Sequence, residues 1–129
     1  MNVTREQLDA KRKGRPLPRP ETEIQSAILA YLRACVPGLW ERNNRGVVRT
    51  PGKGGRDRLI TYGGMEGASD IKGILAPHGR AVAIEVKRPG DNPTVEQQAY
   101  LERVRRVGGI AFVARSIDDV RRELGAATR

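Results

Sequence analysis

Residues 67–87 read Gly-Ala-Ser-Asp-Ile-Lys-Gly-Ile-Leu-Ala-Pro-His-Gly-Arg-Ala-Val-Ala-Ile-Glu-Val-Lys, and this stretch decides the fold. Its two apolar runs, 67–74 and 81–87, are rich in Ile, Val and Ala and predict β-strands. The residues Pro-His-Gly-Arg at 77–80 predict a turn, so the strands should form an antiparallel hairpin. With a loop of two or three residues, the numbers of two residues that pair across the hairpin add up to about 156 or 157. Asp70 should therefore lie opposite Val86 or Lys87.

Three charged side chains should meet at one end of this hairpin. Glu85 and Lys87 point to the same face because side chains alternate along a strand, and Asp70 lies about one residue away from Glu85 along the ladder. Two neighbouring carboxylates repel each other unless a cation lies between them, and Mg²⁺ prefers such oxygen ligands. The alternative is a half-buried hairpin whose rim carries solvated charges.

Length and composition limit the range of functions. The chain has 129 residues, which is enough for one domain. A net charge of +9 indicates a polyanionic partner, nucleic acid first and an anionic membrane second, or else a solvated basic surface. No apolar run predicts a transmembrane helix or a secretory leader. The single Cys35 fits a reducing compartment, and one His with one Cys cannot form a usual zinc site.

The N-terminal third predicts an arm followed by a helix. Residues 1–19 are basic and Pro-containing and read as a flexible arm that either contacts phosphates or takes no part. A helix should run from Pro20 to about Cys35 or Val36, with Cys35 on the buried apolar stripe as a core residue. Glu21 opens this helix, where a negative charge is favourable in any case, so a purely structural role for it stays open.

The middle of the chain predicts short strands around a basic loop. Residues 39–43 read as a strand, and residues 45–49 and 59–62 flank a Gly-rich segment at 50–58. This segment carries Lys53, Arg56 and Arg58. It either contacts a nucleic-acid backbone or is an ordinary hairpin loop.

The C-terminal third alternates helix, strand and helix. Thr94 and Gln97 form a capping-box pattern at the start of a helix that should end near Val107. The apolar face of this helix should comprise Tyr100, Leu101, Val104 and Val107. Residues 110–114 predict a buried, parallel strand, and Ser116 should cap a last helix at 117–124.

The spacing of Asp70, Glu85 and Lys87 resembles the core of the PD-(D/E)xK nuclease superfamily, with Ser69 in place of the proline. The order of elements and motifs across residues 20–125 closely resembles the VRR-NUC family of these nucleases. The matching motifs are Glu21-Thr-Glu-Ile-Gln25, Arg42-Asn-Asn-Arg-Gly46, Gly67-Ala-Ser-Asp-Ile-Lys-Gly73, Glu85-Val-Lys87 and Gln97-Gln-Ala-Tyr-Leu101.

The resemblance implies an α/β fold of the restriction-endonuclease-like type, with a mixed sheet flanked by helices in a single domain at 20–129. It implies that Asp70 and Glu85 hold Mg²⁺ or Mn²⁺ and that Glu21 completes the metal site, Glu23 being a weaker candidate. Lys87 would assist the attacking water, and Gln97 would contact that water or the lysine. One side chain cannot serve the cap and the active site at once.

The resemblance also implies a substrate and an assembly. Stand-alone phage and bacterial members look similar to archaeal Holliday-junction resolvases, so we expect a cytoplasmic homodimer that cuts branched DNA, with an additional protein partner left open. We expect core burial, and not an interface, for Trp40, Met65 and Phe112. A sequence-specific restriction-type nuclease and a non-catalytic basic DNA-binding protein are the alternatives. The predicted DNA-binding residues are Arg42, Asn44, Arg45, Lys53, Arg56, Arg58 and Lys72.

Overall fold

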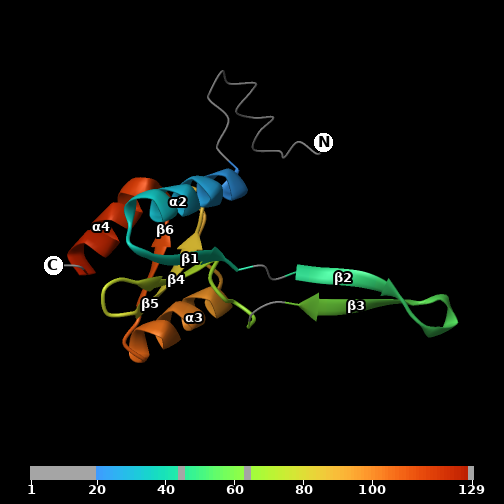
Figure 1. Cartoon of the computed structure of the whole chain (residues 1–129). Coiled ribbons are helices and arrows are strands. Elements are labelled where there is room, and N and C mark those ends of the chain that lie inside the picture. Colours follow the sequence, from blue (N-terminus) through green and yellow to red (C-terminus); the bar gives the residue numbers. More distant parts are fainter. Residues whose placement is uncertain (1–19, 44–45, 63–64, 128–129) are drawn as a thin grey trace, which may run out of the picture.

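A mixed sheet of four strands forms the centre of the molecule (Figure 1). The computed structural model describes residues 20–43, 46–62 and 65–127. The strands are β1 (Gly38–Arg42), β4 (Ile71–Leu75), β5 (Arg80–Val86) and β6 (Ile110–Ala114), in the spatial order β1-β4-β5-β6. Both pairings within β1-β4-β5 are antiparallel, and β6 pairs with β5 in parallel, as the apolar run at 110–114 predicts.

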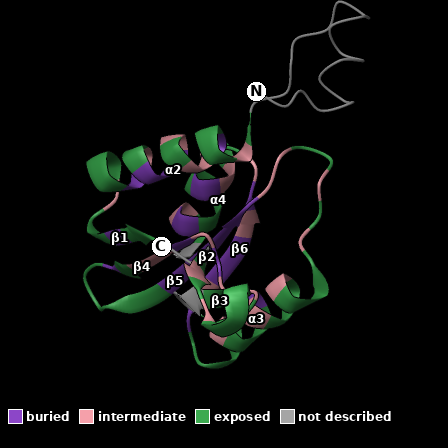
Figure 2. Ribbon diagram, turned by 90° about the vertical axis from the view of Figure 1, so that its right-hand side faces the viewer, coloured by how far each residue is buried: buried purple, intermediate pink, exposed green. Residues whose placement is uncertain are grey.

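Helices cover both faces of this sheet. The helices α2 (Glu21–Cys35) and α4 (Ile117–Ala127) lie on one face, and α3 (Val95–Arg106) lies on the other (Figure 1). The main core fills the space under α2 and α4, where Ile28, Leu32 and Val120 meet Ile84 and Val86 of β5. Buried segments concentrate along the strands and the inner sides of these helices (Figure 2). The fold is the α/β, restriction-endonuclease-like class that the sequence predicted.

Local sequence signals set the helix ends. Pro20 precedes α2, and the chain becomes extended at Val36, just before Pro37. Thr94 caps α3 through the predicted capping box. The backbone N–H of Asp119 donates to Ser116 Oγ at 3.2 Å, which confirms the cap on α4. The last helix runs to Ala127, three residues beyond its predicted end.

The register of the central hairpin differs from the predicted one. Ile71 pairs with Ile84 and Leu75 pairs with Arg80, so paired positions sum to 155. The prediction was wrong because the loop comprises four residues, 76–79, and the N–H of Gly79 closes it by donating to Leu75 O at 3.0 Å. The residue facing Asp70 is therefore Glu85 and neither Val86 nor Lys87.

A second, separate sheet is formed by β2 (Gly46–Pro51) and β3 (Asp57–Tyr62), which pair antiparallel. This hairpin extends away from the rest of the fold (Figure 1). Both strands are longer than predicted. They extend into the two ends of the basic segment at 50–58, whose middle contains a short 3₁₀ turn at Lys53–Gly55. Strand patterns show where a strand forms but leave open which sheet it joins.

Three predicted core positions are exposed. Cys35 is exposed because Val36, four residues after Leu32, takes the place at the end of the apolar stripe. Val107 is 85% exposed because it follows the last residue of α3, and Met65 is 56% exposed in the turn that follows β3. Trp40 and Phe112 are buried as expected.

The predicted arm at 1–19 lies outside the described residues. No helix in the described part of the chain is long and apolar enough to cross a membrane.

Candidate active site

The candidate site lies where β4 begins and β5 ends. Asp70 directly precedes β4, and its Oδ2 accepts a hydrogen bond of 2.8 Å from the backbone N–H of Val86. Its own carbonyl accepts from the N–H of Asn43 at 2.7 Å. One step beyond the Ile71–Ile84 pair, Asp70 faces Glu85, so the two carboxylates belong to neighbouring positions on adjacent strands.

Glu85 is the most unusual side chain of this site. It is 1% exposed, and no N–H or O–H donor of the described residues supplies a hydrogen bond to its carboxylate oxygens, which lie beside the charges of Asp70 and Lys87. Burial raises the pKa of Glu85 to about 8, and the negative charge of Asp70 adds to the rise. A buried carboxylate that receives no hydrogen bond from a donor is costly, so these two oxygens favour a cation or a proton beside them.

Lys87 lies beside Glu85 on the same face of β5. Its Nζ atom is 3.8 Å from Glu85 Oε1, and its side chain is only 13% exposed. The backbone N–H of Lys87 donates to Ala114 O at 3.1 Å, which holds this end of β5 against β6. The Lys87 charge lowers the pKa of Glu85, but this effect is smaller than the rise caused by burial and by the charge of Asp70.

Glu21 approaches the same site from the first turn of α2. It is half-buried, and burial raises its pKa; the charge of Lys87 opposes this rise and that of Asp70 reinforces it. The structure therefore brings Glu21 into electrostatic range of the two residues. Its position at the N-terminus of α2 also suits a negative charge, so the structural and the functional explanations are compatible.

The donor set fits a hard divalent cation with few protein ligands. No group of three or more His, Cys, Asp or Glu side chains in the described ranges is close enough to hold a metal ion together. Mg²⁺ commonly binds through one or two carboxylates and keeps several waters. The carboxylates of Asp70 and Glu85 meet that requirement, and Glu21 fits a ligand that acts through water.

Gln97 occupies the first turn of α3, and its side chain is part of the cap. Its Oε1 accepts from the N–H of Thr94 at 2.8 Å, and Thr94 Oγ1 accepts from the N–H of Gln97 at 3.1 Å. The cap uses only the oxygen of the side-chain amide. The expectation that one side chain cannot serve both roles was therefore too strict, because the cap leaves Nε2 unused and the predicted contact with the site would have to come from that atom.

A glycine connects the cap to the Asp70 segment, which the sequence analysis did not foresee. Gly67 has a φ of +76°, and a Cβ atom there would lie 2.5 Å from the carbonyl oxygen of Glu96. Only glycine lets the chain before Asp70 approach the first turn of α3 this closely. The signal was present in the sequence as the glycine of Gly-Ala-Ser-Asp, three residues before the predicted metal ligand.

The loop after Lys87 adds further residues that the sequence analysis missed. Arg88 Nε lies 3.2 Å from Asp91 Oδ2, and Arg115 Nη2 donates to Asp91 O at 2.8 Å. The charge of Asp91 raises the pKa of Glu21, and that of Arg88 lowers it. This loop therefore borders the site, and its position directly after the Glu-x-Lys triplet was the available signal.

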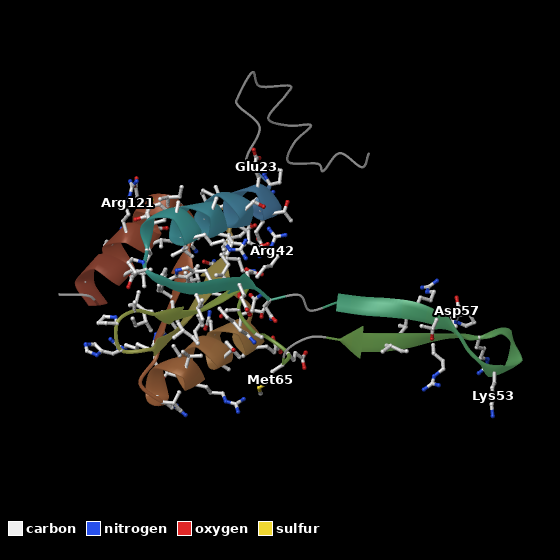
Figure 3. The ribbon with its side chains drawn as sticks, viewed as in Figure 1. Glu23, Arg42, Lys53, Asp57, Met65 and Arg121 are labelled. Atoms are coloured by element: carbon white, nitrogen blue, oxygen red, sulfur yellow. The ribbon has the colours of Figure 1, made fainter. Side chains whose placement is uncertain are left out.

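The five predicted DNA-binding residues that the structure describes do not form a single patch. Arg42 is exposed on β1 and donates to Ser26 Oγ at 2.9 Å, whereas Lys72 Nζ lies 5.9 Å from the centre of the Tyr100 ring. Lys53 lies at the far end of the β2–β3 hairpin (Figure 3), and all three cations of that segment are exposed. Two predicted residues fall outside the described ranges, Asn44 and Arg45.

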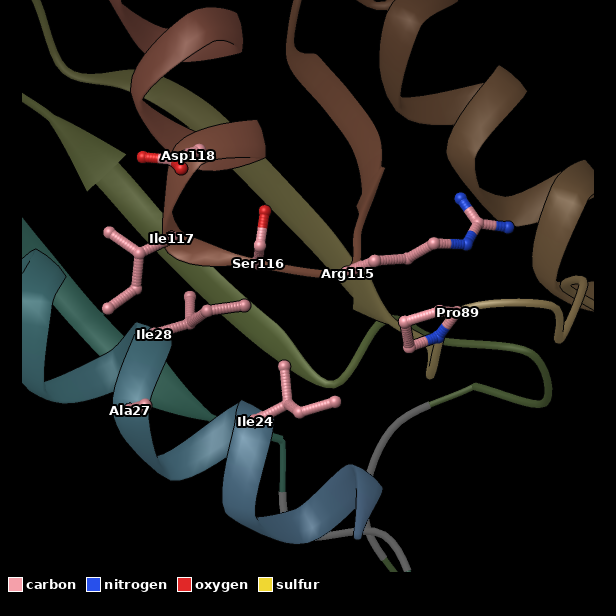
Figure 4. Close-up of a pocket in the computed structure, with 8 residues that line it drawn as sticks. All are labelled: Ile24, Ala27, Ile28, Pro89, Arg115, Ser116, Ile117 and Asp118. Carbon is pink, nitrogen blue, oxygen red and sulfur yellow. The ribbon is translucent and has the colours of Figure 1, made fainter. Parts of the chain in front are cut away.

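A cavity of about 380 Å³ lies between α2 and the start of α4 (Figure 4). Ile24 and Ile28 line it from α2, and Arg115 and Ser116 line it from the chain leading into α4. None of the predicted catalytic residues lines this cavity. The candidate active site is therefore the carboxylate pair at the sheet end and not this hollow.

Comparison with protein families places most of the chain in one domain family. The VRR-NUC domain matches residues 39–118, from β1 to the first turn of α4. The matched region includes Asp70, Glu85, Lys87 and Gln97, whereas Glu21 precedes it. No curated protein matches the chain. Since more than half of the chain fits the domain, the protein belongs to the VRR-NUC family of nuclease domains.

Proposed function

We propose that this protein is a Mg²⁺- or Mn²⁺-dependent DNA endonuclease of the PD-(D/E)xK type. It hydrolyses phosphodiester bonds in an active site formed by Asp70, Glu85 and Lys87. The observation that carries the proposal is the environment of Glu85. No N–H or O–H donor of the described residues supplies a hydrogen bond to its two buried oxygens, Asp70 faces it, and the Lys87 ammonium lies 3.8 Å from Oε1. Carboxylates and lysine in this arrangement suit metal-assisted phosphoryl chemistry.

Each side chain has a distinct task in this reaction. Asp70, oriented by the N–H of Val86, and Glu85 would hold the divalent ion. When bound, such an ion would supply positive charge for the scissile phosphate and make a nearby water more acidic. Lys87 orients the attacking water or neutralises charge that develops on the phosphate. Glu21 adds a contact through water, and Gln97 Nε2 assists the water or the lysine.

DNA is the proposed substrate because the chain has a net charge of +9 and belongs to a nuclease family. The resemblance to stand-alone phage and bacterial nucleases and to Holliday-junction resolvases supports branched DNA and a homodimer in the cytoplasm. A twofold dimer would present two active sites to two strands related by the same symmetry. A further protein partner is compatible with this scheme.

The direct test is cleavage of labelled four-way junction, 5′ flap, single strand and linear duplex with Mg²⁺, Mn²⁺ or EDTA. Paired, metal-dependent cuts in the junction support the proposal. Preference for flaps would replace the junction by another branched substrate. Cleavage of linear duplex at defined sites would instead favour a restriction-type nuclease. Binding without cleavage under every metal would favour a non-catalytic DNA-binding protein.

A further inference from the structure

The β2–β3 hairpin is a sheet of its own. It pairs with no strand of the four-stranded sheet. From Arg49 to Ile60 every side chain is exposed or half-buried, and Leu59 and Ile60 are 66% and 47% exposed. A lone two-stranded hairpin is at best marginally stable in water. A partner that covers residues 49–60 would therefore stabilise this hairpin.

The hairpin is rooted at the candidate active site. Its first strand follows β1, and Asn43 at the end of β1 donates its N–H to Asp70 O at 2.7 Å. Its second strand returns the chain to Met65, five positions before Asp70. Arg42 and Met65 mark this root on the body of the protein, and Lys53 marks the opposite end (Figure 3). A polymer bound at Asp70 therefore passes the base of the hairpin.

Positive charge collects at the far end of the hairpin. Residues 49–60 contain four cations, Arg49, Lys53, Arg56 and Arg58, and one anion, Asp57, which gives a net charge of +3. Arg49 Nε lies 3.9 Å from Asp57 Oδ2 near the middle of the ribbon. The other three cations have no ion pair among the described residues. Phosphate groups are the complementary partner.

Glycines keep the tip narrow. A Cβ atom at Gly52 would lie 2.4 Å from Arg56 O, so glycine is needed where the two strands close. Gly54 and Gly55 both have a φ of +73° and no other atoms within 4 Å of an added Cβ, which leaves the backbone of the tip open. A two-stranded ribbon of this kind has the width that enters a DNA major groove.

We propose that the β2–β3 hairpin is a DNA-gripping arm that carries Lys53, Arg56 and Arg58 to duplex phosphates away from the cleaved bond. Strands of six residues extend about 20 Å, which corresponds to about six base pairs. The location relative to the cleaved bond rests on the proposed function, whereas duplex binding by the arm does not. A second copy of the chain is a less suitable partner for the hairpin than DNA, because two hairpin tips with the same positive charge repel each other.

The test compares two variants that each lose three positive charges. The arm variant carries Lys53→Ala, Arg56→Ala and Arg58→Ala. The matched control carries Arg106→Ala, Arg121→Ala and Arg122→Ala, three exposed arginines on α3 and α4. Affinity for a 20-base-pair duplex is measured in EDTA over a range of salt concentrations, with thermal unfolding to verify that both variants fold.

The arm variant should bind about 10- to 100-fold more weakly near 0.1 M salt, and its log–log salt slope should fall by about 2.7, at about 0.9 per lost contact. The control should change less than about threefold. Equal losses in both variants would overturn the proposal. Because EDTA prevents metal-dependent cleavage, the arm can pass this test even if the protein proves not to be a nuclease.

Two further measurements test where the arm contacts DNA and whether its partner is DNA or a second copy of the chain. Cleavage rates of wild type and arm variant are compared in Mg²⁺ at low DNA concentration, on substrates with duplex arms of different length. The arm variant should be slower only when the duplex extends at least about six base pairs from the cut. A difference independent of duplex length would contradict the placement. Leu59→Ser with Ile60→Ser should leave the molar mass in solution unchanged. A fall from dimer to monomer would instead make the hairpin a contact between copies and overturn the proposal.

Discussion

The Oδ2 atom of Asp70 accepts a 2.8 Å hydrogen bond from the backbone N–H of Val86, the residue between Glu85 and Lys87. This bond joins the start of β4 to the end of β5 at the point where the acidic pair faces the lysine. It uses Oδ2 of Asp70, so Oδ1 is the oxygen that would face the proposed ion. The hydrogen bond therefore orients the carboxylate that we propose as a metal ligand.

Glu85 should make the stability of the metal-free protein depend on pH. Its pKa is raised in the folded state from 4.5 to about 8, so the folded protein retains a proton that the unfolded chain releases. This stability is fully present below about pH 4.5 and is lost as the pH rises through about 8. The slope is at most about 1.4 kcal/mol per pH unit.

The variant Glu85→Gln imitates the protonated side chain and should remove this dependence. Urea unfolding in EDTA from pH 5 to pH 8 should show Glu85→Gln gaining stability over wild type as the pH rises. Glu102→Gln, at a position whose side chain is 53% exposed, is the matched control and should follow wild type. A difference between Glu85→Gln and wild type that is constant with pH would show that Glu85 is ionised in the metal-free protein.

Lys87→Met should lower the cleavage rate at saturating DNA by about 100- to 1,000-fold, because it removes the ammonium 3.8 Å from Glu85. DNA affinity should change much less, since one of many cations is lost. Lys72→Met removes a lysine from β4 that lies over the Tyr100 ring, and it should retain most of the rate. A normal rate with weakened binding in Lys87→Met would make Lys87 a phosphate contact only.

Gly67→Ala should destabilise the fold by about 1–3 kcal/mol, because the new Cβ is both strained and 2.5 Å from Glu96 O. Gly54→Ala has a similar positive φ but meets no atom within 4 Å, so it should cost less. Chemical denaturation of the two variants measures the difference. Equal losses in both variants would show that the close contact between Gly67 and the first turn of α3 contributes nothing to the free energy of unfolding.

Gln97→Glu should separate the cap from the active-site role. Glutamate at this position also completes a capping box, so the free energy of unfolding should stay near that of wild type. The rate at saturating DNA should fall, because the amide nitrogen is lost and a negative charge is gained. The neighbouring Gln98→Glu adds the same charge on the exposed side of the helix and is the control.

Thr94→Ala should lower the stability of the protein and leave the cleavage rate unchanged, whereas Gln97→Glu should lower the rate and leave the stability unchanged. Thr94→Ala removes the hydroxyl that accepts from the N–H of Gln97, so stability should fall by about 1 kcal/mol while the rate stays near wild type. Cleavage by Gln97→Glu at the wild-type rate would assign Gln97 to the cap alone.

Local patterns predicted the features that neighbouring residues determine. The apolar stripe and Pro37 delimit α2, and the Thr94–Gln97 box marks the start of α3. The acidic pair on a hairpin was predicted correctly as a pair, but its register was not. A four-residue loop shifts every pairing, and sequence alone does not set loop length.

Features that depend on tertiary packing were not predictable. The strand pattern at 46–62 did not show that β2 and β3 form a separate sheet. The exposure of Cys35 depends on how α2 lies on the sheet, since Val36 packs there instead. The contribution of Asp91 to the electrostatics around Glu21 requires the loop after Lys87 to fold back toward α2.

The most direct test of the central claim is cleavage of labelled branched DNA by wild type, Asp70→Asn and Asp118→Asn in Mg²⁺, Mn²⁺ and EDTA. Asp118 is an exposed acid at the start of α4, so it controls for the loss of one charge. We expect cleavage by wild type and Asp118→Asn only with metal. Asp70→Asn should bind DNA and lose at least about 1,000-fold in rate, because its amide can still accept from Val86 but binds the ion poorly. Cleavage that persists in Asp70→Asn, or in EDTA, would contradict a metal-dependent site at Asp70 and Glu85.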